Sequence, residues 1–311
     1  MKVAILGYGN QGRAQALNLR DSGWDVVVGA RPGKGWELAQ KDGFAPVDFR
    51  EASVQSQAMM FLLPDLVISE VYEDLADLFS KGQREVGFSH GYAYVFGGIS
   101  HFPQTGYFLV GPKGAGLLLR ENFQLKKGLP GVIAVASPNA TTKELALAYA
   151  KGIGLNSQTL LETTFQEETE CDLFGEQVVL CGGILELMES AFQVLVEEGH
   201  TPEMAFYECC FEAKLILDLW MKEGPKGLSK KISPTAFFGG LTRGRRIIDQ
   251  NTKDKMRAMF KEIRTGKFSK EWGKEALADY PHLTERLQEQ ESSLLEKTFH
   301  QLKPRWEKPL S

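Results

Sequence analysis

The sequence predicts an α/β fold of the Rossmann type with a parallel sheet, followed by a domain built only of helices. Short apolar runs typical of strands alternate with helical patterns up to about residue 137. A glycine-rich turn, Gly7–Gly12, directly follows the first of these runs. Beyond residue 137 the periodicity is helical almost throughout. We therefore expect a nucleotide-binding domain over residues 1–137 and a helical domain over residues 138–311.

The expected strands of the first domain are short and end in turn residues. They cover residues 2–6, 24–28, 58–63, 85–89, 107–110 and 131–136, and helical patterns occupy residues 11–22 and 36–42. Strands that alternate with helices form a parallel sheet with helices on both faces. In the second domain we expect helices at 142–152, 166–199, 202–222, 253–265 and 281–301. The longest should break near Gly182-Gly183.

Composition narrows the class of protein. Hydrophobic residues make up 43% and charged residues 24%, and the net charge is −4. Without a basic excess there is no sign of a nucleic-acid partner. No signal segment is recognisable, and no stretch approaches the ~20 apolar residues of a membrane helix. The four cysteines lack CxxC spacing, which predicts free thiols in a cytoplasmic protein that is not bound to a membrane.

The glycine-rich turn has the spacing G-x-G-x-x-G of dinucleotide sites. It lies between a strand and a helix, which is the context this motif requires. Its glycines let the backbone approach a pyrophosphate, and the helix start offers N–H groups to that anion. The candidate cofactor residues are Gly7, Gly9, Asn10, Gln11 and Gly12. A tight turn that binds no ligand is the alternative.

The end of the second expected strand indicates which dinucleotide binds. NAD sites place an acid there to hold the ribose 2′-hydroxyl, but residues 27–34 contain none. Arg31 and Lys34 are instead suited to a 2′-phosphate. We therefore expect NADP(H) rather than NAD(H). Two solvated cations on a loop are the alternative.

Two of the expected helices each carry a pair of carboxylates four residues apart. The pairs are Asp172 with Glu176 and Glu208 with Glu212. Residues at this spacing share a helix face. Apart from the acids, this face is apolar in both helices. It continues through Val179, Leu180, Gly183 and Leu187 in the first helix and through Met204, Ala205, Leu215, Ile216 and Leu219 in the second. Burying like charges is costly unless a cation compensates them.

A hard divalent cation such as Mg²⁺ suits such oxygen ligands. Four acids on two facing helices could hold two Mg²⁺ ions, whereas a solvated helix surface is the ordinary explanation of such acids. The neighbouring acids Glu167, Glu168 and Glu170 are predicted to lie on other faces, in solvent.

At this point the residues resemble one family, the ketol-acid reductoisomerases, in its short class. The likeness runs in order along nearly the whole chain. It rests on Gly7–Asn18, Leu62–Asp65, His90-Gly91, Pro112–Gly114, Leu145–Gly154, Glu162–Gln177 and Leu241–Gly244. Departures are concentrated between residues 92 and 117, where the family's Gly-Pro-Gly-His reads Gly114-Ala115-Gly116-Leu117.

The resemblance implies a Rossmann domain, a knotted helical domain, and a dimer or larger homo-oligomer whose subunits share an active site. Asp172 would bridge two Mg²⁺ ions, with Glu176 on the first and the partner subunit's Glu208 and Glu212 on the second. Ser233 would bind the substrate carboxylate. His90 and Lys113 would lie near the nicotinamide and the metal-bound waters, and Glu212 would transfer protons.

The implied reaction converts 2-acetolactate, or 2-aceto-2-hydroxybutyrate, into a 2,3-dihydroxy-3-methyl acid. An alkyl group migrates and NADPH then reduces the new ketone, a step in branched-chain amino-acid biosynthesis. Two alternatives remain open. One is a diverged paralogue that binds NADP without this activity, and the other is a metal-independent hydroxyacid or imine reductase, which would leave the paired acids unexplained.

Overall fold

The computed structural model describes residues 2–80, 84–137 and 139–307. The chain forms two compact units, Met1–Cys171 and Asp172–Ser311, and the boundary falls within helix α9 (Phe165–Gly175). The predicted domain boundary lies at residue 138, outside the described residues. That boundary remains a prediction. The compact unit Met1–Cys171 extends past residue 138 and includes one more strand of the sheet, Leu155–Thr163.

The first unit is built on a seven-stranded sheet with the order β2-β1-β3-β4-β5-β6-β7 within the described residues. The strands β1 to β5 pair in parallel, β6 runs antiparallel to β5, and β7 is parallel to β6. Their bounds are Lys2–Leu6, Asp25–Gly29, Ala58–Phe61, Glu85–Phe88, Gly106–Pro112, Leu129–Ala136 and Leu155–Thr163. The predicted parallel sheet is confirmed, with one antiparallel pair near its far edge.

The strand β7 lies where the sequence predicts helices almost throughout, and that expectation was wrong for residues 155–163. The strand lies at the edge of the sheet. Only Leu155 of its nine residues is buried. An exposed edge strand does not need the apolar run or clean alternation that identifies a strand in sequence, so the pattern gave no signal.

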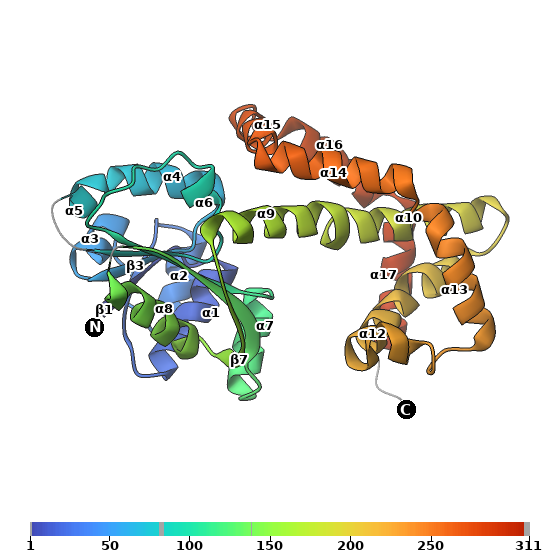
Figure 1. Ribbon diagram of the computed structural model, residues 1–311, viewed down its shortest axis with the longest axis horizontal. Helices are drawn as coiled ribbons and strands as arrows, with labels where there is room; N and C mark the ends of the chain where they lie inside the picture. The colour runs from blue at the N-terminus through green and yellow to red at the C-terminus, as the bar shows by residue number, and fades with distance from the viewer. Residues whose placement is uncertain (1, 81–83, 138, 308–311) are drawn as a thin grey trace. The chain divides into compact units, whose positions relative to one another are not determined.

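Helices cover both faces of this sheet, as predicted (Figure 1). One face packs against α1 (Asn10–Asp21), α2 (Lys34–Lys41), α7 (Gly116–Gln124) and α8 (Ala140–Gly152). The other packs against α3 (Phe49–Val54), α4 (Asp65–Asp74), α5 (Ala76–Ser80) and α6 (Tyr92–Val95). Alternate residues of β1 enter opposite cores, Val3 and Ile5 on one side and Ala4 and Leu6 on the other, as the pleat of a strand requires.

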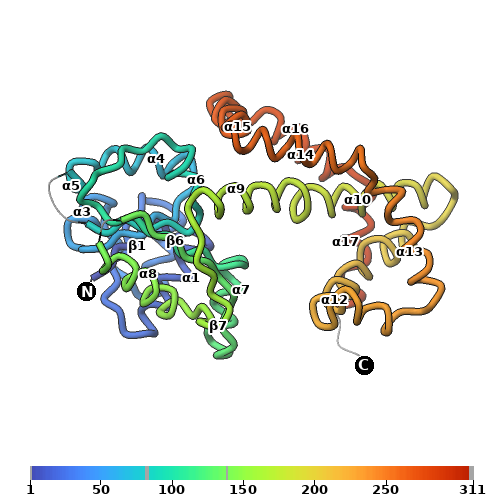
Figure 2. The backbone as a smooth tube through the Cα atoms, viewed as in Figure 1, coloured from blue at the N-terminus to red at the C-terminus, as the bar shows by residue number. Residues whose placement is uncertain are grey.

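The second unit is helical within the described residues (Figure 2). After α9 come a π-helical turn at Glu176–Leu180, α10 (Gly183–Glu197), α11 (Pro202–Phe206), a second π-helical turn at Tyr207–Phe211 and α12 (Glu212–Leu228). The remaining helices are α13 (Pro234–Ile247), α14 (Gln250–Arg264), α15 (Lys267–Leu277), α16 (Pro281–Ser292) and α17 (Leu294–Trp306). The predicted break near Gly182-Gly183 is confirmed, because Gly182 separates the first π-helical turn from α10.

Three features of this unit were not predicted. The helices α13 and α15 occupy stretches with no predicted helix, and Ser293 divides the helix expected over residues 281–301. The backbone of Ser293 is extended and its hydroxyl accepts a hydrogen bond from the N–H of Glu296. A serine in this position caps a helix and so starts a new one.

The second unit has a small core and a large exposed apolar surface. Its buried cluster joins Phe192, Phe206, Cys210 and Leu302, and the ring of Trp306 stacks on Phe206 with centroids 5.8 Å apart. Many large apolar side chains of the unit remain exposed, among them Leu180, Leu187, Leu215, Ile216, Trp220, Met221, Phe238 and Leu241. A monomer rarely leaves so much apolar surface in water.

One helical run of 33 residues, Phe165–Glu197, contains an 18-residue window with a mean hydropathy of 1.6, and is long and apolar enough to cross a membrane by length and composition. The expectation that no stretch approaches this length was therefore wrong. A single helix of this kind is weak support for a membrane span, because apolar helices of other proteins pass the same test. Its first turns also carry Glu167, Glu168, Glu170 and Asp172.

Candidate active site

Two glycines of the glycine-rich turn, Gly7 and Gly12, lie where no side chain fits. Gly7 has φ +105°, and a Cβ there would lie 2.5 Å from the carbonyl oxygen of Leu62. A Cβ on Gly12 would lie 2.0 Å from the carbonyl oxygen of Gly7. The turn therefore packs directly against the end of β3 and the start of α1, which leaves its outer side open to a ligand.

The start of α1 retains its capacity to bind an anion. Gly9, which has no side chain, occupies the N-cap position, so no capping side chain bonds to the first N–H groups within the described part of the chain. The side-chain amide of Gln11 donates a hydrogen bond to the carbonyl oxygen of Gly114 over 3.0 Å. This bond joins the turn to the segment after β5. N–H groups without a capping side chain at a helix start are suited to a pyrophosphate.

An open hollow of about 470 Å³ lies beside this turn. Its lining includes Gly7, Gly9, Ala30, Arg31 and Lys34. The guanidinium of Arg31 lies 5.8 Å from the centroid of the Phe49 ring and 3.5 Å from a carboxylate oxygen of Glu70. The two cations predicted for a 2′-phosphate are thus in one hollow with the glycine turn, although Arg31 also faces an acid.

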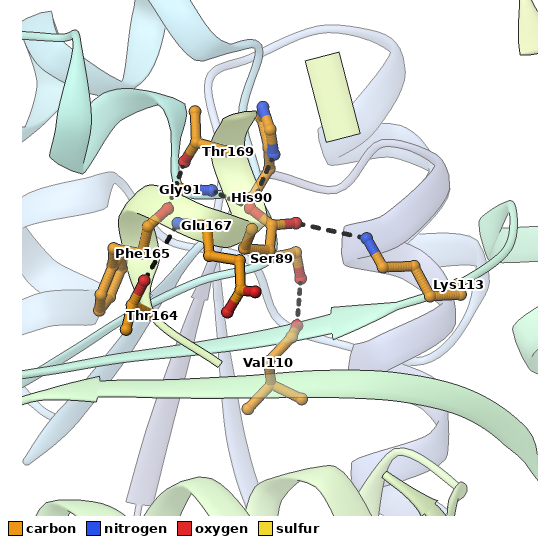
Figure 3. A network of polar contacts seen from close by, with 10 residues as sticks. Ser89, His90, Gly91, Val110, Lys113, Thr164, Phe165, Glu167 and Thr169 are labelled. Carbon is orange, nitrogen blue, oxygen red and sulfur yellow. Dashed lines mark hydrogen bonds and ion pairs between the residues drawn. The ribbon is translucent and has the colours of Figure 1, made fainter. Parts of the chain in front are cut away.

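Two of the predicted catalytic residues lie just after the carboxyl ends of neighbouring parallel strands. His90 follows β4 and Lys113 follows β5, at the edge where open α/β sheets bind their ligands. Both contact Glu168 of α9, and Figure 3 shows His90 and Lys113 in the network of polar contacts at the start of this helix. The Nδ1 atom of His90 is 3.1 Å from Oε2 of Glu168, and Nζ of Lys113 is 3.5 Å from Oε1.

Glu168 is a buried carboxylate, and its side chain is only 2% exposed. The backbone N–H of Gly91 also donates to its Oε2 over 2.9 Å. Because a carboxylate only accepts, His90 must carry a proton on Nδ1 in this hydrogen bond. The carboxylate therefore selects the tautomer of the histidine and holds its ring. The ammonium of Lys113 compensates the buried negative charge.

The prediction that Glu168 and Glu170 lie in solvent was wrong, since they are only 4% and 7% exposed. Glu167 is exposed as predicted. The sequence did contain a signal for Glu168, because it precedes Asp172 by four residues as Asp172 precedes Glu176. Three acids at this spacing continue one helix face. The face of Glu170 becomes buried only through tertiary packing.

Asp172 lies one turn beyond Glu168 on α9 and is partly buried. One ligand atom each from His90, Glu168 and Asp172 lies within 4.8 Å of the other two. Among the described residues this is the one group of three or more acids, histidines or cysteines that could hold a metal ion. Carboxylate oxygens at this separation suit a hard divalent cation.

The remaining predicted metal residues are exposed. Glu176 begins the first π-helical turn, while Glu208 lies in the second and Glu212 follows it. Neither Glu208 nor Glu212 joins the group around Glu168 within the described part of one chain. The apolar faces that carry these pairs are also largely exposed. The prediction that these acid pairs are buried is therefore not fulfilled within a single chain.

Ser233, the predicted substrate residue, caps helix α13. Its hydroxyl oxygen accepts a hydrogen bond from the N–H of Ala236 over 3.1 Å, and the residue is exposed. A helix start suits a carboxylate ligand, but the structure does not bring Ser233 into the group around Glu168.

Comparison with known proteins accounts for both halves of this arrangement. Residues 1–158 match the model of the acetohydroxy acid isomeroreductase NADPH-binding domain, and residues 165–307 match that of the ketol-acid reductoisomerase C-terminal domain. The chain belongs to the ketol-acid reductoisomerase family. The resemblance predicted from the motifs is confirmed.

Curated ketol-acid reductoisomerases (NADP(+)) are similar to the chain over most of their length. The protein of Methanocaldococcus jannaschii is 42% identical over 303 residues, covering 97% of this chain and 92% of the relative. That of Saccharolobus solfataricus is 41% identical over 304 residues, covering 97% and 91%. The predicted class, an NADP-dependent isomeroreductase, is that of these relatives.

Solved structures agree with this membership. An NADH-preferring ketol-acid reductoisomerase from an uncultured archaeon has a TM-score of 0.92 and 37% identity, covering 97% of this chain and 94% of its own. A semialdehyde dehydrogenase NAD-binding protein from Cupriavidus necator (TM-score 0.65) and a pyrroline-5-carboxylate reductase from Coxiella burnetii (0.52) share only 18% and 15% identity. At such low identity these two structures show only a shared fold, so they do not favour the imine-reductase alternative.

Proposed function

We propose that this chain is a magnesium-dependent ketol-acid reductoisomerase that rearranges 2-acetolactate or 2-aceto-2-hydroxybutyrate and reduces the product with NADPH. Family membership gives the reaction class. The observation that carries the assignment of residues is the buried carboxylate of Glu168, which contacts His90 and Lys113 and adjoins Asp172. These groups come from three separate parts of the chain and meet at the carboxyl edge of the sheet.

For the cofactor, Gly7, Gly9, Asn10, Gln11 and Gly12 would hold the pyrophosphate, and Arg31 and Lys34 would hold the 2′-phosphate. The uncapped start of α1 supports the first role and the shared hollow supports the second. NADPH supplies the hydride when bound. NADH is to be tested beside it, because the similar archaeal enzyme is described as NADH-preferring.

For the metal, the donor set fits Mg²⁺. Asp172 and Glu176 would hold the metal together with Glu208 and Glu212 of the partner subunit. Bound Mg²⁺ would act as a Lewis acid that polarises the substrate keto group and lowers the pKa of its hydroxyl. The group of His90, Glu168 and Asp172 supports this fit, since a partly buried carboxylate lies beside a fully buried one.

The chain's own residues would bind, orient and transfer protons. Glu168 holds the ring of His90 in one tautomer and places the cation of Lys113 next to it. His90 and Lys113 would face the reacting end of the substrate, and Glu212 would accept and return the hydroxyl proton. Ser233, at the start of α13, would bind the substrate carboxylate.

We also propose a homodimer, or a larger homo-oligomer, whose subunits complete each other's sites. Glu208 and Glu212 do not join the acid group of their own chain, and the apolar faces beside both acid pairs are exposed. A second copy would cover those faces and bring in the missing acids. The exposed apolar side chains of the run Phe165–Glu197 would then form a subunit contact rather than a membrane span. We propose in addition that the enzyme is cytoplasmic and has no nucleic-acid partner.

The deciding experiment is NADPH oxidation by the purified protein with 2-acetolactate, with and without Mg²⁺ and with NADH in parallel. We expect turnover that requires Mg²⁺. The variant Asp172→Asn should abolish turnover and leave NADPH binding unchanged, because Asp172 belongs to the acid group and not to the glycine turn. Metal-independent turnover, or full activity of Asp172→Asn, would overturn the assignment.

A further inference from the structure

The segment after His90 places an aromatic stack against the start of α9. The ring of Tyr94 is stacked on that of Phe165 with centroids 4.0 Å apart and on that of His101 with centroids 4.3 Å apart. Two rings cannot occupy the same face of a third at these distances, so Tyr94 lies between them. Tyr107 of β5 meets Tyr94 edge to face at 5.4 Å.

Phe165 is the first residue of α9 and is buried. Its ring also meets Phe88, the last residue of β4, at 6.2 Å and 80°. Its carbonyl oxygen accepts a hydrogen bond from the Thr169 hydroxyl. The stack thus joins the first turn of α9 to the end of the strand that leads into His90.

One turn along α9 from Phe165 lies Glu168, which accepts from Gly91 and contacts His90 and Lys113. Asp172 follows on the next turn. A shift of the first turn would therefore move Glu168 relative to His90, and would move Asp172 with it. The hydrogen bond from Gly91, the close packing of Gly91 against Phe165 and Thr169, and the stack on Tyr94 all join this turn to the segment after His90.

We propose that Tyr94 is a positioning residue that sets the first turn of α9 against His90 and thereby determines the affinity of the acid group for divalent metal. The inference rests on the proposed function, since it concerns the metal site named there. Tyr94 itself is half-buried and its outer partner His101 is exposed, so the stack lies at the margin of the core rather than at its centre.

The test compares Tyr94→Leu with Tyr94→Phe. Leucine keeps apolar volume but removes both stacks, whereas phenylalanine keeps them. Mn²⁺ binding measured by electron paramagnetic resonance reports the metal site without turnover, and fluorescence titration reports NADPH binding. An aromatic pair contributes beyond the burial of its area, so we expect Tyr94→Leu to weaken Mn²⁺ binding by about two- to twelvefold.

NADPH affinity should stay unchanged in Tyr94→Leu, because Tyr94 does not line the hollow beside the glycine turn, and Tyr94→Phe should restore Mn²⁺ binding. Trp24→Leu is the matched control. It removes another partly buried ring, which meets Tyr149 at 6.0 Å on the other face of the sheet. It should lower thermal stability without changing Mn²⁺ affinity.

Three results would overturn the inference: unchanged Mn²⁺ affinity in Tyr94→Leu, an equal loss of NADPH affinity, or an equal loss of Mn²⁺ affinity in Trp24→Leu. The last two would mean that the ring serves only general stability. Failure of the proposed function is distinguishable, because it would show as wild-type protein without Mg²⁺-dependent turnover, whatever the variants do to Mn²⁺ binding.

Discussion

Glu168 shows how one buried side chain organises the site. An unpaired carboxylate at 2% exposure would be very unfavourable, but here a backbone N–H, a histidine and a lysine compensate it. The same contacts hold His90 and Lys113 in place. The carboxylate therefore links the ends of two strands to the helix that carries Asp172.

We predict that Glu168→Gln lowers kcat by about 10²-fold, the range in which positioned acid–base groups act. The amide is neutral, so it removes the negative charge of Glu168 beside Lys113 and can hold His90 in the other tautomer. NADPH binding should be unchanged in a fluorescence titration. Glu167→Gln is the matched control on the exposed side of the same turn and should be fully active. Equal activity of the two variants would contradict the role of Glu168.

The cofactor loop gives a second prediction at this scale. Arg31→Ala should weaken NADPH binding by about tenfold, the loss expected for a charge-assisted hydrogen bond to phosphate, and should change NADH binding little. Isothermal titration with both dinucleotides measures the difference. If both affinities fall alike, the guanidinium supports the loop, for instance through Glu70, and does not read the 2′-phosphate.

Among the elements, the two π-helical turns are informative because they coincide with the acid pairs. The first begins at Glu176, and the second contains Glu208 and ends directly before Glu212. A π-turn inserts an extra residue into a helix and often marks a functional site. It changes the direction in which side chains point after the turn, so the simple i, i+4 argument from sequence places the acids only approximately.

The strand β4 carries a site of pH-dependent stability at its first residue. Glu85 has a raised pKa because burial disfavours its charged form, and its Oε2 atom is buried without a hydrogen-bond partner. A carboxyl whose pKa is raised by folding stabilises the protein most fully below its unfolded pKa. That contribution is lost as the pH rises through the folded pKa.

We therefore expect Glu85→Gln to raise the thermal midpoint at pH 7 and to have little effect near pH 4. Water screens part of the cost of a half-buried carboxyl, so the rise should be modest, about 2–4 °C for a unit of this size. Differential scanning calorimetry at both pH values measures it. A lower midpoint at pH 7 would show that the charged form is stabilised after all.

At the scale of the whole molecule, the exposed apolar surface of the second unit is the observation that supports the proposed homo-oligomer. Leu215 and Ile216 are 51% and 43% exposed and lie directly after the acid pair of Glu208 and Glu212. Burial of such side chains contributes about 25 cal/mol per Å². A second copy of the chain would gain this energy and bring in its acids together.

We predict that Leu215→Lys dissociates the oligomer and lowers Mg²⁺-dependent turnover at least tenfold, because a buried lysine in an apolar contact is strongly unfavourable. NADPH binding, which belongs to the first unit, should persist. Light scattering after size exclusion measures the mass. Leu277→Lys, at a leucine that is 91% exposed, should change neither property. An unchanged mass for Leu215→Lys would place the interface elsewhere.

Features that depend on local chemistry were determined by the sequence. Most strands of the sheet, the glycine turn between β1 and α1, and the break at Gly182 follow from short-range patterns, and the structure has them where they were expected. The reason is that a turn, a cap or an apolar period is encoded within a few residues. The family, too, could be identified from contiguous motifs.

Other features were decided only by tertiary structure. The edge strand β7 pairs with β6 although its own pattern is mostly polar, and Glu168 becomes buried because α9 starts against Gly91, His90 and Lys113. The stack of Tyr94 on Phe165 joins residues 71 positions apart in the chain. Burial, charge compensation and ring contacts depend on which distant segments meet, and no periodicity within one segment encodes that.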